Sequence, residues 1–186
     1  MVTFMVAMNT AWGFFMDKDS GIFFEMLTYP ITRRQILIGK IGFNVLVSLL
    51  CSTLVIAIGI LVFDAPVDWA RLPVAVLLVP VATASWFFFF STFAITLTRM
   101  DAFNTVTSAA YILLMFFSSM FYPLEGLPVW FRVISYVNPL TWQVDLLRFG
   151  VLGTGDPTAL LLEAVAAGVF CIACLTFAVR AMNRAA

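Results

Sequence analysis

Few side chains in this sequence have the types and spacing of a catalytic site. There is no histidine among the 186 residues, which removes the usual general base and the most common metal ligand. Cys171 and Cys174 form a C-x-x-C pair, but both lie in an apolar stretch, whereas a redox pair of this kind needs a soluble context. We therefore interpret these two cysteines, and Cys51 with them, as small packing residues.

The motifs of nucleotide and nucleic-acid chemistry are also absent from the sequence. Its glycines do not form the G-x-x-x-x-G-K-[ST] loop that cradles phosphates in P-loop enzymes. Ten Lys and Arg are balanced by ten Asp and Glu, without the basic stripe that nucleic-acid binding needs. We expect no enzymatic activity, no cofactor or metal, and no nucleic-acid partner.

Glu163 is the one charged residue inside the long apolar stretches of the chain. An ionisable side chain within a membrane span is a functional-site hypothesis by default. Glu163 lies about six residues into its stretch, which is ~9 Å at the helical rise, so its carboxylate could instead snorkel to the interface. We carry both interpretations: an intramembrane polar site, and an interfacial carboxylate.

The composition is that of an integral membrane protein. Hydrophobic residues make up 63% and charged residues 11% of the chain, and the mean hydropathy is +1.06. Soluble domains contain about 25% charged residues, so this inventory cannot cover a water-facing surface. A membrane span needs about 20 apolar residues. The stretches of suitable length are Ile41–Phe63, Leu72–Thr98, Ala102–Leu124 and Pro157–Val179.

The first apolar run, Met1–Met16, is shorter than these four. It lacks the charged flank and the cleavage site of a secretory signal, so we expect the end of a span whose beginning is missing or shortened. The predicted fold class is therefore all-α: a polytopic membrane helix bundle with four full spans and a partial N-terminal span, forming a single domain over residues 1–186.

Basic residues between the spans predict the orientation, because cytoplasmic loops carry an excess of Lys and Arg. Alternating sides gives seven basic residues on one face and three on the other. The seven are Lys18, Arg33, Arg34, Lys40, Arg99, Arg180 and Arg184, and the three are Arg71, Arg132 and Arg148. The face with seven is expected in the cytoplasm, together with residues 20–40 and the C-terminus.

The segment "SGIFFEMLTYPITRRQILIGK", Ser20–Lys40, interrupts the apolar runs on that face. Ser20 is a suitable N-cap and Pro30 stops a helix, which predicts a helix of about nine residues; Thr32 then caps the next one. The short helix is apolar almost all round. It either lies on lipid headgroups or inserts into a groove of a cytosolic partner, and we favour the partner.

The segment "FYPLEGLPVWFRVISYVNPLTWQVDLLRFG", Phe121–Gly150, lies on the opposite side and is too apolar for a solvated loop. Pro128–Val137 and Pro139–Phe149 are each about ten residues, enough helix for half a bilayer, and Asn138-Pro139 is a turn signal. We expect a helical hairpin that enters the membrane partway and returns, with Trp130 at the interface. The alternative is an amphipathic loop lying flat outside.

These two segments make the chain similar to the permease subunit of type-2 ATP-binding-cassette (ABC) exporters, in the branch of antibiotic-resistance and nodulation-factor exporters. The resemblance implies that one segment is a coupling helix received by an ATPase and that the other is a re-entrant hairpin. The coupling residues would be Ser20, Ile22, Phe23, Phe24, Glu25, Met26 and Leu27, and the hairpin residues Pro128, Trp130, Asn138, Pro139, Asp145 and Arg148.

The same resemblance implies a multi-pass protein of the bacterial cytoplasmic membrane, with two ATPase subunits and a second permease, identical or different, as partners. Family members usually have six spans after an amphipathic helix. That helix and the first span are missing here, so the chain is expected to be N-terminally shortened.

The expected function is outward transport of an amphipathic or drug-like substrate. Export of lipid-linked glycan or polysaccharide is the alternative, together with a non-transporting scaffold or an ion-coupled carrier. A carrier should have embedded charge pairs or broken helices, and only Glu163 lies inside a span, so we favour the exporter.

Overall fold

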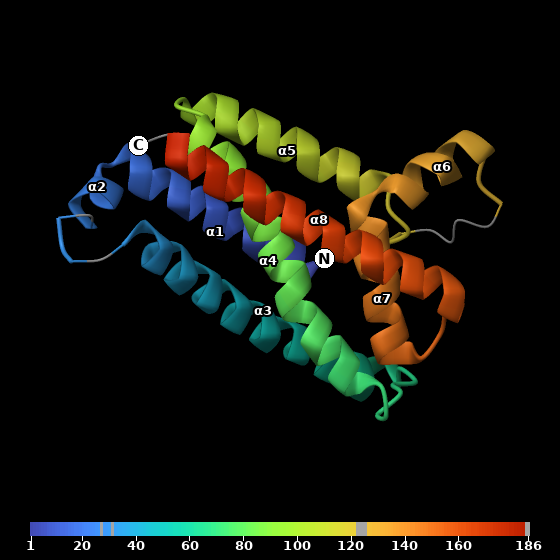
Figure 1. Cartoon of the computed structure of the whole chain (residues 1–186). Coiled ribbons are helices and arrows are strands. Elements are labelled where there is room, and N and C mark those ends of the chain that lie inside the picture. Colours follow the sequence, from blue (N-terminus) through green and yellow to red (C-terminus); the bar gives the residue numbers. More distant parts are fainter. Residues whose placement is uncertain (27, 31, 122–125, 185–186) are drawn as a thin grey trace.

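The computed structural model describes residues 1–26, 28–30, 32–121 and 126–184, and for residues 24, 33, 34, 37 and 183 it describes the backbone only. Within this part of the chain every regular element is a helix (Figure 1). The helices are α1 (Val2–Asp19), α2 (Ile22–Met26), α3 (Arg33–Phe63), α4 (Leu72–Thr96), α5 (Met100–Phe116), α6 (Val129–Val137), α7 (Pro139–Leu152) and α8 (Pro157–Arg184). The predicted all-α bundle is confirmed.

Three helices are long and apolar enough to cross a membrane, on the criteria of length and composition. They are Ile38–Phe63 within α3, Leu72–Thr96, and Pro157–Met182 within α8. These correspond to three of the four predicted full spans.

The fourth predicted span is shorter than expected, because α5 ends at Phe116. Ser118 follows, and its hydroxyl donates to the carbonyl oxygen of Met115 (2.8 Å). Side-chain hydrogen bonds of this kind compete with the helical ladder. Leu124, where the predicted span ended, lies outside the described residues.

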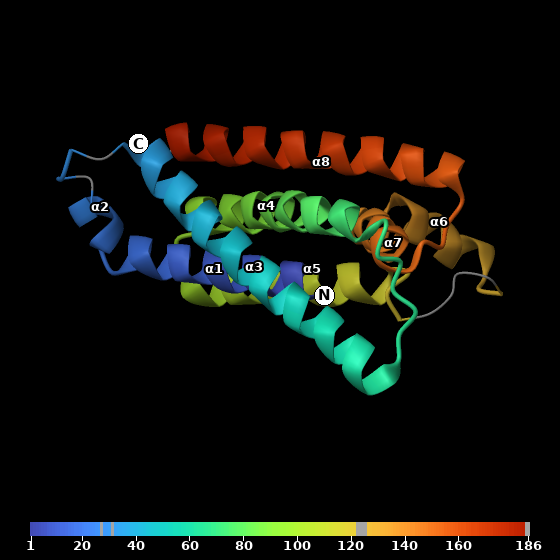
Figure 2. The same ribbon diagram turned by 90° about the horizontal axis from the view of Figure 1, so that it is seen from below.

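Helix α4 is the centre of the bundle. It packs against α8 on one side and α1 on the other, and it also contacts α3 and α7 (Figure 2). In its apolar window 44% of the residues are buried, against 6% in α3. Helix α3 is therefore peripheral, and most of its surface faces outward from the chain.

The core lies where the aromatic residues of α4 meet α1 and α8. Trp86 is fully buried and packs edge-to-face on Phe4, with 4.5 Å between ring centroids. Phe170 of α8 also packs on Trp86, with 5.3 Å between ring centroids. Because lipid tails are as apolar as these rings, shape-complementary packing holds the helices together here more than water exclusion does.

The beginning of α3 is capped as the sequence predicts. The hydroxyl of Thr32 accepts from the backbone N–H of Gln35, whose side chain accepts from the N–H of Thr32 in return. This reciprocal capping box satisfies two helix-end donors. It fixes the point at which the chain re-enters a long helix after the short α2.

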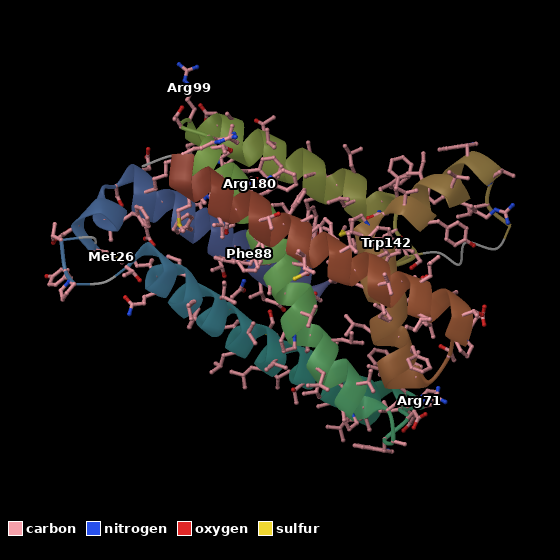
Figure 3. All side chains as sticks on the ribbon, in the orientation of Figure 1. Met26, Arg71, Phe88, Arg99, Trp142 and Arg180 are labelled. Atoms are coloured by element: carbon pink, nitrogen blue, oxygen red, sulfur yellow. The ribbon has the colours of Figure 1, made fainter. Side chains whose placement is uncertain are left out.

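The helix directions gather the basic residues as the alternation predicts. The C-terminal ends of α1 and α8, the beginnings of α3 and α5, and α2 lie at one end of the molecule (Figure 1). Arg99 and Arg180 lie toward that end and Arg71 at the opposite one (Figure 3). The end that carries α2 is the one predicted to face the cytoplasm.

Cysteine labelling tests this orientation. In a background with Cys51, Cys171 and Cys174 replaced by serine, Asp101→Cys should react with an impermeant maleimide only after permeabilisation. Thr154→Cys should react in intact cells, because both side chains are exposed but lie at opposite ends. The neighbouring Gly153 is unsuitable, since an added Cβ would lie 2.9 Å from Asp68. The reverse labelling pattern would invert the assignment.

Candidate functional site

The first candidate site is the segment that joins α1 to α3. Helix α2 has five residues, Ile22–Met26, instead of the nine that we predict. Ser20 is the C-cap of α1 and its hydroxyl donates to the carbonyl oxygen of Met16 (2.7 Å), so its assignment as an N-cap is wrong. Gly21 has a positive φ of 82°, a conformation that suits glycine and that ends α1 before α2 begins.

The two faces of α2 have different surroundings. Phe23 is buried and packs edge-to-face on Phe14 of α1, with 5.4 Å between ring centroids. Ile22 and Glu25 are exposed and Met26 is half-buried, and residues three and four apart share one helix face. The outward face is thus Ile22, Glu25 and Met26, while Phe23 is an internal anchor. Leu27 and the side chain of Phe24 lie outside the described part.

Charged side chains connect the end of α1, where this segment begins, to α3 and α4. Lys40 of α3 forms an ion pair with Asp17 and lies over the ring of Phe14 at 5.6 Å. Lys18 donates to the carbonyl oxygens of Ala94, Ile95 and Leu97, at 3.1, 2.7 and 2.9 Å. Burial lowers the pKa of Lys18, opposed by the charge of Asp19. These three bonds use every proton of the ammonium group.

The second candidate site is the hairpin at the opposite end. Helices α6 and α7 meet at the predicted turn, where Asn138 ends the first and caps the second. Its side-chain oxygen accepts from the N–H of Leu140 (3.0 Å), and its amide donates to the carbonyl oxygen of Leu114 near the end of α5 (2.7 Å). Pro128 is the N-cap of α6, and Pro139 occupies the first position of α7.

A polar cluster attaches α7 to the segment after α5. Asp145 accepts from the hydroxyl of Ser119 (2.9 Å) and pairs with Arg148 (3.2 Å), which also donates to the carbonyl oxygen of Ser119 (3.1 Å). These bonds connect α7 to the segment that follows α5.

Two tryptophans form further hydrogen bonds that hold the hairpin in place. Trp142 of α7 donates to the carbonyl oxygen of Tyr136 in α6 (2.7 Å), which joins the two arms. Trp86 donates to the side-chain oxygen of Gln143 (2.6 Å), which joins α7 to the central helix. Trp130 is 61% exposed and lies on the outward face of α6. The link between Trp86 and Gln143 escaped the sequence analysis, because 57 positions separate its partners.

The chain between α3 and α4 also reaches the end of α7. The backbone N–H of Asp68 donates to the carbonyl oxygen of Val151 (2.8 Å), and Arg71 donates to that of Gly153 (2.7 Å). The guanidinium of Arg71 lies over the ring of Phe149 at 4.7 Å. The loop after α3 is thereby bound to the hairpin.

Glu163 lies on α8, half-buried, and its Oε2 atom is buried without a hydrogen-bond partner in the part of the chain that the structure describes. The described residues contain no group of three His, Cys, Asp or Glu that could hold a metal ion. Cys174 is buried, and Cys171 and Cys51 are half-buried, all as free thiols.

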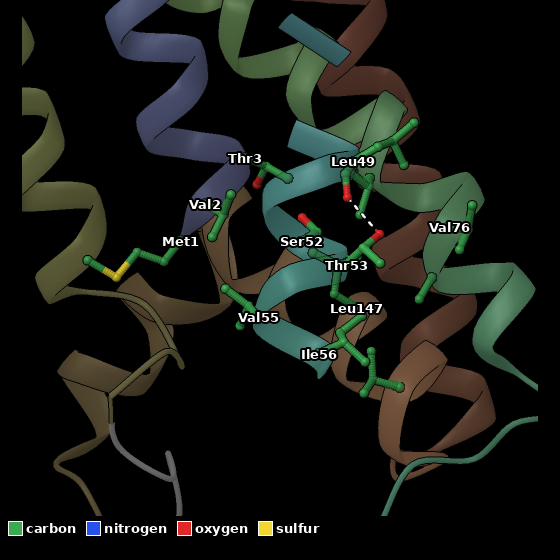
Figure 4. A pocket seen from close by; sticks show the side chains of 13 residues that line it. Met1, Val2, Thr3, Leu49, Ser52, Thr53, Val55, Ile56, Val76 and Leu147 are labelled. Atoms are coloured by element: carbon green, nitrogen blue, oxygen red, sulfur yellow. Dashed lines mark hydrogen bonds between the residues drawn. The ribbon is translucent and has the colours of Figure 1, made fainter. Parts of the chain in front are cut away.

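An apolar cavity of about 170 Å³ lies between α1, α3, α4 and α7 (Figure 4). The hydroxyl of Thr53 donates to the carbonyl oxygen of Leu49 (2.8 Å) in its own helix, so the wall presents mainly methyl groups. The lining includes Val2, Thr3, Ser52, Ile56, Val79 and Leu147. Pockets for whole drug-sized molecules measure about 300–1,000 Å³, so this one accommodates part of such a molecule.

Comparison with known proteins decides the family. A family model described as "ABC-2 type transporter" matches residues 1–152, from the beginning of the chain to the last residue of α7. The chain belongs to this ABC-2 family. It is a permease subunit and a multi-pass protein of the bacterial cytoplasmic membrane.

Relatives of the chain are found in Escherichia coli and Shigella flexneri. The chain is 27% identical over 149 residues to proteins named "Inner membrane transport permease YadH" from Escherichia coli strain K12 and from Shigella flexneri. The match covers 80% of this chain and 57% of each relative. The ABC-2 chain therefore spans little more than half the length of these relatives.

Asn138 offers a test of how the hairpin is held. Asn138→Ala removes the cap of α7 and leaves the carbonyl of Leu114 unpaired. Each loss costs about 1 kcal/mol, so the thermal unfolding midpoint of the purified protein should fall by roughly 4–8 °C. Asn138→Asp keeps the cap of α7 and loses the amide donor to Leu114, so its unfolding midpoint should fall about half as far. Equal midpoints for Asn138→Ala and the unchanged protein would contradict this role.

Proposed function

We propose that the chain is the membrane half of an ATP-driven exporter and that α2 is the coupling helix on which an ABC ATPase subunit acts. The observation that carries this proposal is the division of α2 into an anchored face and a free face. A five-residue helix has no stability of its own, so Phe23 on Phe14 holds it in place. The outward residues Ile22, Glu25 and Met26 are left for a partner.

The partner's movement has a continuous path into the bundle. Displacement of α2 acts on Phe14 through Phe23, and so on α1. Lys18 connects the end of α1 to the end of α4. Trp86 of α4 then connects to α7 through Gln143. Coupling requires such a contiguous network with two arrangements. In the proposal, ATP binding and hydrolysis switch the network and move the outer hairpin.

The proposed assembly contains two permeases, identical or different, and two ATPase subunits, with the transport path between the permeases. The hairpin of α6 and α7 is proposed to be re-entrant, because its outward face is apolar: Trp130 and Tyr136 are 61% and 58% exposed. Aromatic residues of this kind favour the membrane interface. The hairpin would then form the outer gate.

The proposed substrate is amphipathic or drug-like and moves outward. The apolar cavity between α1, α3, α4 and α7 supports this class, since it suits an aliphatic or aromatic group of a larger molecule. Lipid-linked glycan or polysaccharide is the alternative substrate class. Its polyprenyl tail would also suit an apolar cavity, so the transport assay below includes both classes.

Coupling is tested on the outward face of α2. Ile22→Asp with Met26→Asp should abolish copurification of the co-expressed ABC ATPase, because each buried apolar side chain contributes about 1.5–3 kcal/mol, or more than a hundredfold in affinity for the pair. Substrate-stimulated ATP hydrolysis should fall with it.

The control for this test is Trp69→Asp, which puts an acidic residue on an exposed apolar site at the other end. It should copurify with the ATPase as the unchanged protein does. Phe23→Ala, which frees α2 from α1, should retain part of the association and lose stimulation. Full association and stimulation in the Ile22 and Met26 double variant would show that α2 only rests on lipid.

The cavity is tested by filling it. Ser52→Phe should reduce efflux of amphipathic dyes at least fivefold, because its ring occupies the space between α3 and α7. Leu54→Phe is the matched control, on the same helix but 63% exposed and outside the cavity. Efflux from cells that express the permease with its ATPase is the measurement, beside export of a labelled lipid-linked glycan. Equal dye efflux for both variants would remove the cavity from the transport path.

A further inference from the structure

A second cavity, of about 610 Å³, opens between the ends of α1, α4 and α8 on the same side as α2. Three of the residues that line it are basic and none is acidic. The lining is Lys18, Thr92, Ile95, Thr96, Thr98, Phe177, Arg180, Ala181 and Arg184. The coupling path uses Lys18, but neither that path nor the apolar cavity accounts for Arg180 and Arg184.

The arginines of this cavity have no partner in the part of the chain that the structure describes. Arg180 and Arg184 are exposed, and no described residue forms an ion pair or hydrogen bond with either of them. They lie four residues apart on α8, where like charges repel. Lys18 adds a third charge, although its protons are donated to the end of α4. The site therefore favours an anion.

The deeper part of the cavity is apolar. Phe177 is 58% exposed and lies one turn further along α8 toward the centre of the span than Arg180. Ile95 of α4 and Ala181 of α8 face the same space. An occupant must therefore be charged at the end of the bundle and apolar toward the middle of the membrane, which excludes a simple inorganic ion as the best fit.

We infer that this cavity binds an anionic phospholipid from the leaflet on the side of α2, with its phosphate on Arg180 and Arg184 and an acyl chain along Phe177. Basic pockets between transmembrane helices hold acidic headgroups in this way. Guanidinium groups suit phosphate because they donate two parallel hydrogen bonds. The hydroxyls of Thr92 and Thr96 donate to their own helix, so the arginines and Thr98 supply the donors.

Native mass spectrometry of the purified full chain tests the site directly. Phosphatidylglycerol should bind at least tenfold more tightly than phosphatidylcholine with the same acyl chains. Arg180→Gln with Arg184→Gln should weaken phosphatidylglycerol binding about thirtyfold, because each basic residue near the headgroups contributes about 1 kcal/mol, or roughly fivefold. Replacing both with lysine keeps the charge and should restore most of the affinity.

Arg99→Gln is the matched control, since it removes one exposed charge at the same end but outside the cavity. It should bind phosphatidylglycerol within twofold of the unchanged protein. Equal binding of the two lipids would overturn the inference, as would an unaffected double glutamine variant. Competition by glycerol phosphate at the concentrations at which the lipid binds would also overturn it, by making the site one for soluble phosphate esters.

Discussion

The rest of the bundle depends on the contacts that the indole of Trp86 makes with three other helices. Its ring is fully buried against Phe4 of α1 and Phe170 of α8, and its N–H reaches Gln143 of α7. One side chain of α4 thus contacts three other helices. In a membrane the solvent does not drive helices together, so close packing and interhelical hydrogen bonds must do so. Trp86 supplies both kinds of contact at one position.

Around this contact, two polar side chains bind backbone groups at the ends of other helices. Lys18 binds the last carbonyls of α4, and Asn138 binds the end of α5 and the beginning of α7. Carbonyls at helix ends have no partner within their own helix, and lipid offers none. The same bonds that satisfy these orphan groups also join consecutive helices, so the bundle has little freedom to separate at its corners.

Much of this architecture follows from the sequence. Charge-free stretches give the long helices, the capping box at Thr32 sets the beginning of α3, and Asn138-Pro139 sets the hairpin turn, because each of these signals is local. The failures have a common cause. Ser20 can cap either of two helices, and only the positive φ of Gly21 decides which. Phe23 looks free until Phe14 is brought against it. The bond between Ser119 and Asp145 joins residues 26 positions apart, beyond the range of any local pattern.

The peripheral position of α3 has a mechanical consequence. This helix of 31 residues is roughly 46 Å long at 1.5 Å per residue. It is held at one end by the ion pair of Lys40 with Asp17, and at the other its loop is bound to α7 through Asp68 and Arg71. A rigid rod of this length that pivots by about 5° moves its far end by roughly 4 Å. In the proposed coupling, α3 would act as a lever that converts a small rotation beside α2 into a displacement at the end where α6 and α7 lie, in parallel with the proposed path through the core.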